Sequence, residues 1–505
     1  MPPLRKVLIA NRGEIALRVV RACQELGIRS VAVYSDADAA APHVREADEA
    51  VHIGPAPAAE SYLRGDHIIA VAKSVGADAI HPGYGFLSER EWFARAVREA
   101  GLVWVGPPAE AIAAMGSKTA ARTLAISAGT PVVPGTTEPL RDAEEAAAIA
   151  ARFGYPVLLK AAAGGGGKGM RVVREPSEIA SALASAQREA KNAFGDDAVY
   201  VEKYIEGPRH VEIQVLADQH GNCIALGERE CSVQRRHQKM IEEAPSVAVT
   251  PELRKRMGDA AVAAAKAAGY VNAGTCEFLL AQNGEFYFLE MNTRIQVEHP
   301  VTELVMGIDL VQWQLRIAGG EPLPFTESPA PRGWAIECRI TAEDPANGFL
   351  PSTGRIEHLQ APAGPGVRWD SGVTRGSVVG LSYDPMLAKL IVFAPTRELA
   401  ITRMERALKE LVVDGIETSR EFHLRMMADE EFRRGDINIQ WLEARLPSLL
   451  AARPPSATLE AAAIAAALIA EQDRGAVASR RAPENTAAQQ SAWGRVARRE
   501  ALRRG

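Results

Sequence analysis

Residues 275–298 read TCEFLLAQNGEFYFLEMNTRIQVE, and this stretch predicts how the middle of the chain folds. Two apolar runs flank Asn283-Gly284, a dipeptide that favours a two-residue turn between antiparallel strands. In that register Glu277 lies directly opposite Glu290. Two facing carboxylates destabilise a strand pair unless a cation neutralises them, and Mg²⁺ bridged to substrate phosphates has the required preference for oxygen ligands. The alternative is a pair of solvated carboxylates on an exposed face.

Polar residues alternate along the chain beyond this hairpin. In extended form Asn292, Arg294, Gln296 and Glu298 share one face, and Asn292 could add a metal ligand. Arg294 offers paired donors suited to a carboxylate or to bicarbonate. Glu298 is a candidate base that a nearby cation would keep ionised. The alternative is a strand with a solvated polar face.

Residues 164–169, GGGGKG, lie between two strand-like runs at 155–160 and 170–174. Glycines allow backbone amides to approach phosphate oxygens, and Lys168 adds a cation. This is not a Walker loop, because Gly169 follows the lysine and a strand follows the loop. The pattern predicts a hairpin flap that closes over a nucleotide, and the alternative is a flexible hairpin tip. Other candidate anion-binding residues, each with a surface role as the alternative, are Lys118, Lys160, Arg235, Arg236, His237 and Lys239.

The amino-terminal segment alternates strand and helix patterns. Short apolar runs at 7–10, 31–34 and 79–80 are typical of buried parallel strands, with a helical pattern after the first of them. This order predicts a doubly wound parallel sheet up to about residue 116. The first turn has one glycine rather than GxGxxG, so a dinucleotide site is not expected.

Length and composition limit the class of protein. With 505 residues the chain exceeds one hydrophobic core, and 47% apolar with 24% charged residues is typical of soluble globular proteins. A net charge of −5 gives no overall basic surface for nucleic acid. No apolar run is long enough to span a membrane, and the first residues do not read as a secretory signal. Five cysteines without CxxC spacing favour reduced thiols in the cytoplasm and no structural zinc.

The pattern divides the chain into four regions. We expect an α/β amino-terminal domain at 1–116 and an α+β central domain at 117–334, with a lid at about 133–204. A third domain is expected at 335–446. Prolines then precede an Ala/Arg-rich tail at 447–505, which carries nine arginines against five acidic residues and a predicted helix at about 458–471.

Seven strings in order resemble the biotin carboxylases of the ATP-grasp superfamily, and the resemblance covers residues 4 to about 445. The strings are IANRGEIALR, HPGYGFLSE, GGGGKGMRVV, EKYIEGPRHVEIQVLAD, CSVQRRHQK, FLEMNTRIQVEHPVTE and ECRITAEDP. The resemblance implies a Rossmann-like amino-terminal domain, an ATP-grasp domain with a mobile lid, and a carboxy-terminal biotin carboxylase domain. It also implies that ATP, bicarbonate and carrier-bound biotin give ADP, phosphate and N-carboxybiotin through carboxyphosphate.

The resemblance also assigns roles to residues of this chain. It implies that ATP is held by Lys118, Lys160, Gly165, Gly166, Gly167, Lys168, Gly169, Glu202, Lys203, Ile205, His210, Gln234, His237, Glu277 and Glu290. Two Mg²⁺ or Mn²⁺ ions would be held by Glu277, Glu290 and Asn292. Bicarbonate would be bound by Lys239, Arg294, Gln296 and Val297. Glu298 would deprotonate bicarbonate, Arg339 would stabilise the enolate-like biotin oxygen, and Tyr84 would lie near biotin.

Partners follow from the same resemblance. No AMKM-like biotinylation segment is found, so biotin is expected on a separate carrier, and the alternative is that the sequence stops before such a segment. We also expect a homodimer or larger assembly and a carboxyltransferase subunit, in an acyl-CoA carboxylase of the acetyl-, propionyl- or methylcrotonyl-type. Pyruvate or urea carboxylases, another ATP-grasp ligase and a non-catalytic scaffold subunit are the alternatives.

Overall fold

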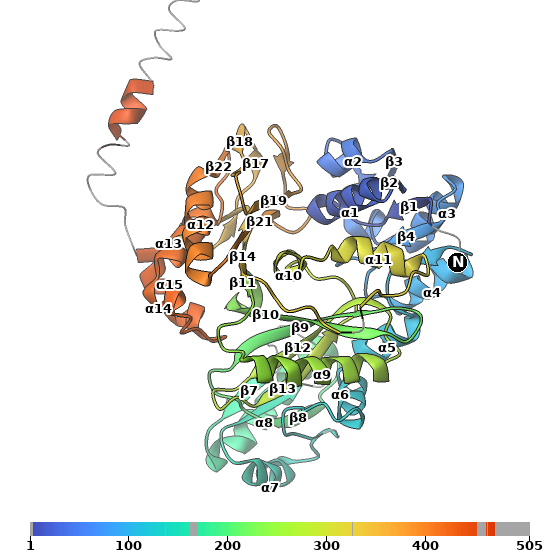
Figure 1. Ribbon diagram of the computed structural model, residues 1–505. Helices are drawn as coiled ribbons and strands as arrows, with labels where there is room; N and C mark the ends of the chain where they lie inside the picture. The colour runs from blue at the N-terminus through green and yellow to red at the C-terminus, as the bar shows by residue number, and fades with distance from the viewer. Residues whose placement is uncertain are drawn as a thin grey trace, which may run out of the picture. The chain divides into compact units, whose positions relative to one another are not determined.

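A five-stranded parallel sheet forms the amino-terminal part of the protein in the computed structural model (Figure 1). Its strands are β1 (Lys6–Ile9), β2 (Arg29–Ser35), β3 (Glu49–Gly54), β4 (Ala79–His81) and β5 (Val103–Trp104). They lie in the order β3-β2-β1-β4-β5, and all four pairings are parallel. The order reverses at β1, so the predicted doubly wound parallel sheet is confirmed.

Helices cover both faces of this sheet, and successive side chains of β1 point alternately into the two hydrophobic cores that result. Val7 and Ile9 pack with α1 (Gly13–Glu25), whereas Leu8 packs with helices on the other face. These other helices are α3 (Gly65–Ser74), α4 (Glu91–Glu99) and α5 (Ala109–Gly116), and the short α2 (Pro42–Glu46) precedes β3. The first glycine turn, between β1 and α1, therefore opens at the carboxyl edge of the sheet.

The structure describes residues 4–136, 138–161, 170–325, 327–451, 461 and 463–469, and only the backbone of Lys118, Ala193 and Phe194. The chain divides into two units, Met1–Leu450 and Ala451–Gly505. In the second unit, the described residues 461 and 463–469 are helical and exposed. The rest of the helix predicted at 458–471 lies outside the described residues.

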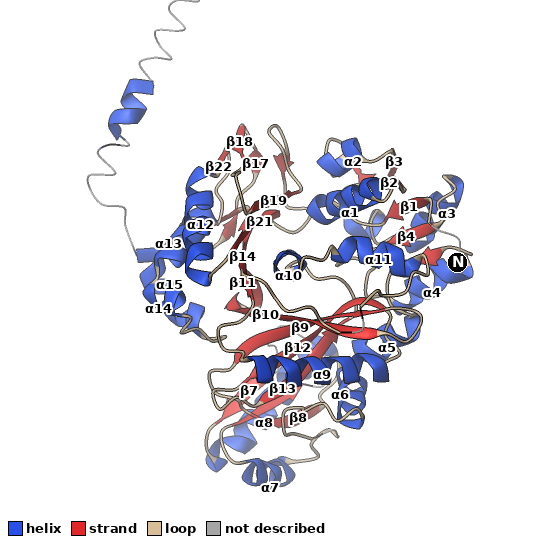
Figure 2. Ribbon diagram, viewed as in Figure 1, coloured by secondary structure: helices blue, strands red, loops and turns tan. Residues whose placement is uncertain are grey.

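An eight-stranded antiparallel sheet forms the centre of the first unit (Figure 2). Its strands, in spatial order, are β13 (Phe286–Asn292), β12 (Asn272–Leu280), β9 (Arg209–Ala217), β10 (Cys223–Arg235), β11 (Gln238–Ala244), β14 (Trp334–Thr341), β21 (Met386–Ala394) and β19 (Val367–Ser371). Because β11 pairs with β14, the sheet runs without a break across the boundary predicted at residue 334. The division of this unit into three domains stays a prediction.

The turn predicted at Asn283-Gly284 is wrong, although the facing carboxylates are confirmed. Leu280 pairs with Phe286, and the Ala281 N–H donates to the Glu285 oxygen at 2.8 Å, so the connection is longer than two residues. A register shift between Glu277 and Phe278 then brings Glu277 opposite Glu290. The shift adds one residue on β13, and it offsets the error in the turn.

A small separate sheet has the order β7-β6-β8 and its own core. The strands are β6 (Val157–Ala161), β7 (Met170–Val173) and β8 (Val199–Lys203), and the helices that cover them are α7 (Ala143–Phe153) and α8 (Ile179–Phe194). The antiparallel pairing of β6 with β7 confirms the predicted hairpin arms. Residues 162–169 between them lie outside the described residues, so the flap at Gly165–Gly169 stays a prediction.

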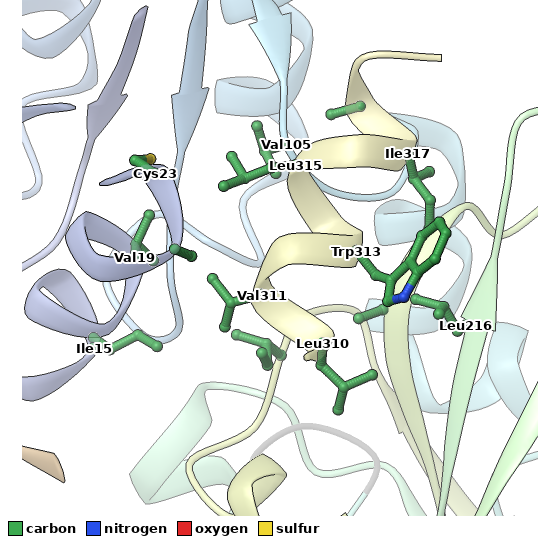
Figure 3. Packing of buried hydrophobic residues seen from close by; sticks show 14 of the residues in the cluster. Ile15, Val19, Cys23, Val105, Leu216, Leu310, Val311, Trp313, Leu315 and Ile317 are labelled. Carbon is green, nitrogen blue, oxygen red and sulfur yellow. The ribbon is translucent and has the colours of Figure 1, made fainter. Parts of the chain in front are cut away.

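Helices attach these sheets to one another. Figure 3 shows α11 (Leu310–Ala318) between side chains of α1 and Leu216 of β9, with Trp313 on the side of Leu216. The face of the large sheet at β9, β12 and β13 packs on α9 (Pro251–Ala267) and α6 (Lys118–Ser127). The remaining helices are α10 (His299–Met306), α12 (Arg397–Glu410), α13 (Arg420–Ala428), α14 (Glu430–Arg434) and α15 (Trp441–Ala451).

Helix α15 extends the first unit past the boundary predicted at residue 446. Pro447 lies inside α15 and does not end it, Leu449 is buried, and the Arg425 Nη1 donates to the Leu449 oxygen at 2.8 Å. The short remaining strands are β15 (Glu343–Asp344), β16 (Leu350–Pro351), β17 (Gly354–Arg355), β18 (His358–Gln360), β20 (Val378–Val379) and β22 (Val412–Asp414). The first of the prolines is therefore part of the first unit and does not mark its end.

The five cysteines are unpaired, as predicted, and four of them are buried. Burial raises the pKa of the Cys23 thiol to about 12 and that of Cys223 to about 11, so neither is a thiolate near neutral pH. Within the described residues no helix is long and apolar enough to cross a membrane.

Stability should fall with acid because α13 buries a neutral histidine. His423 Nε2 lies 2.7 Å from the Arg339 backbone oxygen, and burial lowers its pKa to about 4, against about 6.5 for an unfolded chain. The unfolded chain therefore binds this proton near pH 6.5 and the native protein does not, so stability is lost as pH falls from 6.5 towards 4. We expect His423→Gln to lessen the loss of unfolding free energy between pH 7 and pH 5 by about 2 kcal/mol.

Urea unfolding of both proteins at pH 7 and pH 5 measures this difference. The control is His358→Gln, which should keep the wild-type loss because this side chain is exposed in the native protein. An unchanged pH dependence in His423→Gln would show that His423 does not contribute to the acid sensitivity.

Candidate active site

A cavity of about 870 Å³ collects residues from all parts of the first unit. Most of the residues predicted to carry chemistry line it, namely Tyr84, Lys160, Glu202, His210, Gln234, His237, Lys239, Glu277, Glu290, Asn292, Arg294, Gln296, Val297, Glu298 and Arg339. The side chain of Lys118 and residues Gly165, Gly166, Gly167, Lys168 and Gly169 lie outside the described part of the chain. Lys203 and Ile205 lie at and after the end of β8 and do not line the cavity.

Lys239 on β11 is the centre of the charged cluster. Its Nζ lies 2.5 Å from Glu212 Oε2, 3.0 Å from Glu277 Oε1 and 2.6 Å from Glu298 Oε1. Burial disfavours the ammonium, but the three carboxylates outweigh burial and raise the pKa of Lys239 well above its usual value. The lysine is therefore charged, and it holds together three acidic groups that would otherwise repel one another.

The candidate base Glu298 lies between two cations. Besides Lys239, the Arg339 Nη2 donates to Glu298 Oε2 at 3.0 Å. Burial alone would raise the pKa of Glu298, but Lys239, Arg339 and Arg229 lower it well below its usual value. Glu298 is thus ionised at neutral pH, which a base requires.

Residues 293–298 do not form the predicted extended strand. β13 ends at Asn292, and the following bends lead into α10, for which Glu298 is the N-cap residue. Asn292, Arg294, Gln296 and Glu298 nevertheless all line the cavity. The alternation in the sequence therefore predicted which residues share the site, while the predicted backbone conformation was wrong.

Sequence reasoning missed the buried residues Arg229, Glu212 and Gln214, of which Glu212 contacts Lys239 directly. Arg229 on β10 is fully buried and donates from Nε to Glu212 Oε1 at 2.5 Å and from Nη1 to Gln214 Oε1 at 2.7 Å. Its Nη2 donates to Thr275 Oγ1 at 3.0 Å. His210, Glu212 and Gln214 alternate along β9, and this polar alternation within an apolar strand was the available signal.

The metal-ligand prediction centres on Glu277. His210 Nε2 lies 3.1 Å from Glu277 Oε2, and both Asn292 Nδ2 and Gln296 Nε2 donate to Glu277 Oε1 at 2.9 Å. Burial opposes ionisation, yet Lys239 and His210 lower the pKa of Glu277 well below its usual value. An ionised carboxylate facing Glu290, with an amide beside it, is an oxygen donor set that fits Mg²⁺ or Mn²⁺.

Two other groups of described residues have metal-ligand spacing. They are His210 with Glu212 and Glu277, and Glu212 with Cys231 and Glu298. Both groups contain Glu212, whose carboxylate already contacts two cations, Arg229 and Lys239, so its charge is compensated without a metal ion. We therefore keep Glu277, Glu290 and Asn292 as the predicted ligands.

Arg294 is held by a residue that the sequence did not single out. Its Nε donates to Glu89 Oε2 at 3.1 Å, and its Nη2 donates to Asn292 Oδ1 at 3.1 Å. Glu89 follows the glycine-rich loop after β4, whereas Arg294 follows β13. A carboxylate therefore contacts the guanidinium where an anionic substrate is predicted to bind.

Arg339 on β14 is oriented by another carboxylate that the sequence did not single out. Glu242 is fully buried on β11 and accepts from Arg339 Nε at 2.7 Å. Its cross-strand neighbour is Glu337, another fully buried acid, and burial raises the pKa of both. Among the described residues, neither oxygen of Glu337 has a hydrogen-bond partner, which fits a protonated acid beside an ionised one.

Tyr84 is placed by the contact between two amino-terminal loops. Asn11 Nδ2 donates to the backbone oxygens of Pro82 and Tyr84, both at 2.7 Å. Gly83 has φ +62°, and a Cβ there would lie 2.8 Å from Asn11 Nδ2, so only glycine fits. The Tyr84 hydroxyl then donates to Glu14 at the start of α1.

At the end of the cavity where the nucleotide is predicted to bind, the ion pairs of the described residues are longer than those around Lys239. Lys160 Nζ lies 3.6 Å from Glu202 Oε2, and Arg122 Nη1 lies 3.5 Å from Glu202 Oε1. The Lys203 N–H donates to the Pro134 oxygen, so a contact of its backbone with nucleotide would have to use its carbonyl oxygen. Apolar side chains of Val133, Met170, Phe288 and Leu289 line this end.

The basic residues 235–239 do not converge on one anion. Arg235 stacks on Phe349, with its guanidinium carbon 4.1 Å from the ring centroid, and donates to the Gly348 oxygen. His237 is exposed in the turn between β10 and β11, while Lys239 points into the carboxylate cluster. Of the two interpretations, a solvated or an anion-holding segment, neither describes all of these residues.

Three family profiles match successive parts of the chain. The profile of the biotin carboxylase N-terminal domain matches residues 3–112, and that of the biotin carboxylase C-terminal domain matches 337–444. Between them, the profile of the carbamoyl-phosphate synthase L chain ATP binding domain matches residues 117–326.

Curated relatives align over most of the chain. A biotin carboxylase of Haemophilus influenzae is 54% identical over 445 residues, which is 88% of this chain and 99% of the relative. A pyruvate carboxylase subunit of Methanothermobacter thermautotrophicus is 54% identical over 87% of this chain and 89% of its own. The alpha chain of methylcrotonoyl-CoA carboxylase of Rattus norvegicus is 50% identical over 88% of this chain and 63% of its own.

A solved structure has the same fold. The biotin carboxylase domain dimer of Hydrogenobacter thermophilus 2-oxoglutarate carboxylase, in complex with MgADP, ADP and bicarbonate, superposes with a TM-score of 0.83. It is 47% identical and covers 90% of this chain and 100% of its own.

Proposed function

Because the chain belongs to the biotin carboxylase family, we propose that it carboxylates biotin on a separate carrier as one subunit of an acyl-CoA carboxylase. The protein is an ATP-dependent ligase, a biotin carboxylase with an ATP-grasp domain. It uses ATP, Mg²⁺ and bicarbonate, in keeping with the ligands of the related dimer. The scaffold alternative is thereby set aside, and so is another ATP-grasp ligase, because both flanking profiles are those of biotin carboxylase.

One observation carries the assignment of roles. The Glu298 carboxylate lies in the cavity between two cations, with Lys239 at 2.6 Å and Arg339 at 3.0 Å. Lys239 comes from β11 and Arg339 from its neighbouring strand β14. In the proposed mechanism Glu298 removes the proton of bicarbonate, which Arg294, Gln296 and the Val297 backbone hold. The bicarbonate oxygen then attacks the γ-phosphate of ATP and gives carboxyphosphate and ADP.

The ion pair with Lys239 suggests how Glu298, a weak base in these contacts, would become an effective one. Paired with Lys239 and Arg339, Glu298 has a pKa well below its usual value and binds a proton poorly. If Lys239 turns to the transferring phosphate when ATP and bicarbonate bind, it no longer lowers that pKa, whereas Arg339 keeps its contact with Glu298 until biotin arrives in the second half of the reaction. Substrate binding would therefore strengthen the base at the moment when it acts.

The second half of the reaction uses the Arg339 side of the cavity. Carboxyphosphate breaks down to CO₂ and phosphate, and the phosphate removes the N–H proton of biotin. Arg339 would stabilise the enolate-like oxygen that forms, with Tyr84 beside the ring, and the nitrogen then attacks CO₂. Mg²⁺ or Mn²⁺ on Glu277, Glu290 and Asn292 would neutralise the phosphate charges.

Related chains are subunits of carboxylases with several subunits, and the related domain forms a dimer. We include in the proposal a biotin carrier, a carboxyltransferase subunit, a homodimer or larger assembly and a cytoplasmic location, which five unpaired cysteines support. The methylcrotonoyl-CoA carboxylase relative supports an acyl-CoA as the final acceptor of the carboxyl group. The pyruvate carboxylase relative makes pyruvate the alternative acceptor, and an assay with both compounds would distinguish them.

Substitution of the proposed base tests the chemical step. Glu298→Gln should lower bicarbonate-dependent ATP cleavage at least a hundredfold, because general base catalysis contributes roughly that much, and should leave ATP binding largely intact. Phosphate release from ATP with bicarbonate, with and without free biotin, is the assay. Stimulation of the wild type by ammonia or an amine, and not by biotin, would contradict the proposed reaction, and near-normal turnover of the variant would remove Glu298 from the base role.

Substitution of Arg339 separates biotin from bicarbonate. Arg339→Ala should reduce carboxylation of free biotin about a hundredfold, and biotin-independent ATP cleavage clearly less, since its charge serves the biotin oxygen. Because the variant leaves Glu242 buried without its partner, unfolding by urea should be measured beside activity, with Arg339→Lys as the conservative control. Equal losses in both assays would assign Arg339 to the earlier step.

Removal of residues 452–505 tests the role of the tail. We expect them to be dispensable for carboxylation of free biotin but needed for full binding of a partner subunit, because positive charge predominates in the tail and the rest of the chain is acidic. Truncation after Ala451 keeps α15 whole, unlike truncation at 446. A pull-down with carrier or transferase subunits tests binding, and loss of free-biotin activity in the folded, shortened protein would contradict this division of roles.

A further inference from the structure

Lys389 on β21 is a fully buried lysine that none of the proposed roles uses. Its Nζ donates to the Val297 backbone oxygen at 2.8 Å and lies 3.2 Å from Glu14 Oε2. The side chain of Lys389 is 0% exposed and that of Glu14 is 2% exposed. Burying such a pair costs desolvation that well-packed apolar residues would avoid, so stability alone is a poor reason for it.

The hydrogen bond from Lys389 fixes one particular peptide group. The Val297 oxygen belongs to the peptide that joins Val297 to Glu298, and residues 293–298 have no strand or helix to hold them. On one side of this peptide is the backbone proposed to bind bicarbonate, and on the other is the proposed base, which also begins α10. A shift of this peptide would move both groups.

The position of Lys389 is itself well determined. It lies directly opposite Arg339 in the β14–β21 pairing, and β21 is itself held on its other side by the edge strand β19. Glu14 comes from the first turn of α1, and it also accepts the hydrogen bond from the Tyr84 hydroxyl. The pair therefore ties the amino-terminal helix, the loop 293–298 and β21 to one point.

We propose that Lys389 is a positioning residue that holds the Val297–Glu298 peptide in the geometry needed to bind and deprotonate bicarbonate, with Glu14 as its buried counter-ion. This inference rests on the proposed roles of Val297 and Glu298. Lys389 does not line the cavity, so it acts through the peptide and not on the substrate.

The test is the substitution Lys389→Met, which keeps length and removes the ammonium. The KM for bicarbonate should rise about tenfold or more and kcat of bicarbonate-dependent ATP cleavage should fall, since a charged hydrogen-bond donor is lost. The KM for ATP should stay within about twofold, because none of the polar contacts described for Lys160, Glu202 and His210 involves Lys389. An unchanged KM for bicarbonate would overturn the inference.

A double variant separates positioning from stability. Lys389→Met leaves the Glu14 charge buried and unpaired, and Glu14→Gln in the same chain removes that charge while keeping an acceptor for Tyr84. The double variant should regain stability against urea but keep the raised KM for bicarbonate. If stability against urea and the wild-type KM for bicarbonate are both restored in the double variant, Lys389 serves only stability.

A matched control breaks a buried ion pair elsewhere. Arg397 contacts Glu243 at 2.7 Å, away from the cavity, and Glu243 keeps the hydrogen bond from Trp334. Arg397→Met should therefore lower stability without changing the KM for bicarbonate. A rise of that KM in this control would mean that any destabilisation has the same effect, and would overturn the inference.

Direct binding distinguishes this inference from the proposed function. Line broadening of ¹³C-bicarbonate by the full-length protein with MgADP should be seen for the wild type and be about tenfold weaker for Lys389→Met. If the wild type binds bicarbonate and cleaves ATP with it, and Lys389→Met does both equally well, only the role of Lys389 is rejected. A wild type that neither binds bicarbonate nor cleaves ATP with it would reject the proposed function, and the role of Lys389 with it.

Discussion

The ammonium of Lys239 is the interaction on which the rest of the site depends. Glu212, Glu277 and Glu298 all lie within 3.0 Å of it, and without a cation their mutual repulsion in a buried setting would be severe. Arg229 supplies a second charge from below, through Glu212. Positive and negative charges in the cluster therefore nearly balance. A substrate anion can take the place of a carboxylate beside a cation, and a metal cation can take the place of the ammonium beside a carboxylate.

The antiparallel sheet is what brings these charges together. Lys239 and Glu242 lie on β11, Arg339 and Glu337 on β14, and Lys389 on β21, so successive strands contribute charged side chains to one region of the interior. The loop from Asn292 to Glu298 lies against this row, held by Arg339 and Lys389. Hydrogen-bonded strands move little relative to one another, which keeps these groups within hydrogen-bond distance.

The carboxylates that the sequence did not single out have a common feature. Glu212, Glu242, Glu337 and Glu89 do not belong to a recognisable spacing of their own, apart from the alternation along β9. A charged residue inside an apolar strand, as in the segments around Glu212, Glu242 and Glu337, was the signal that could have revealed them. The turn at Asn283-Gly284 shows the opposite case, in which a correct pairing came from an incorrect loop because a bulge compensated for it.

The sequence by itself determined the parallel amino-terminal sheet, the paired strands of the centre and the set of alternating residues from Asn292 to Glu298, whereas the bulge in β13 decided that Glu277 faces Glu290. These depend on local periodicity and on turns between neighbouring segments, which a few residues specify. Only the tertiary structure decided that Glu14, Val297 and Lys389 meet, that Arg339 shares Glu298 with Lys239, and that α15 continues through Pro447. Such contacts join residues far apart in the chain, and they exist only because the pairing of β11, β14 and β21 and the packing of α1 bring distant segments into one low-dielectric interior, where each charge must find a partner.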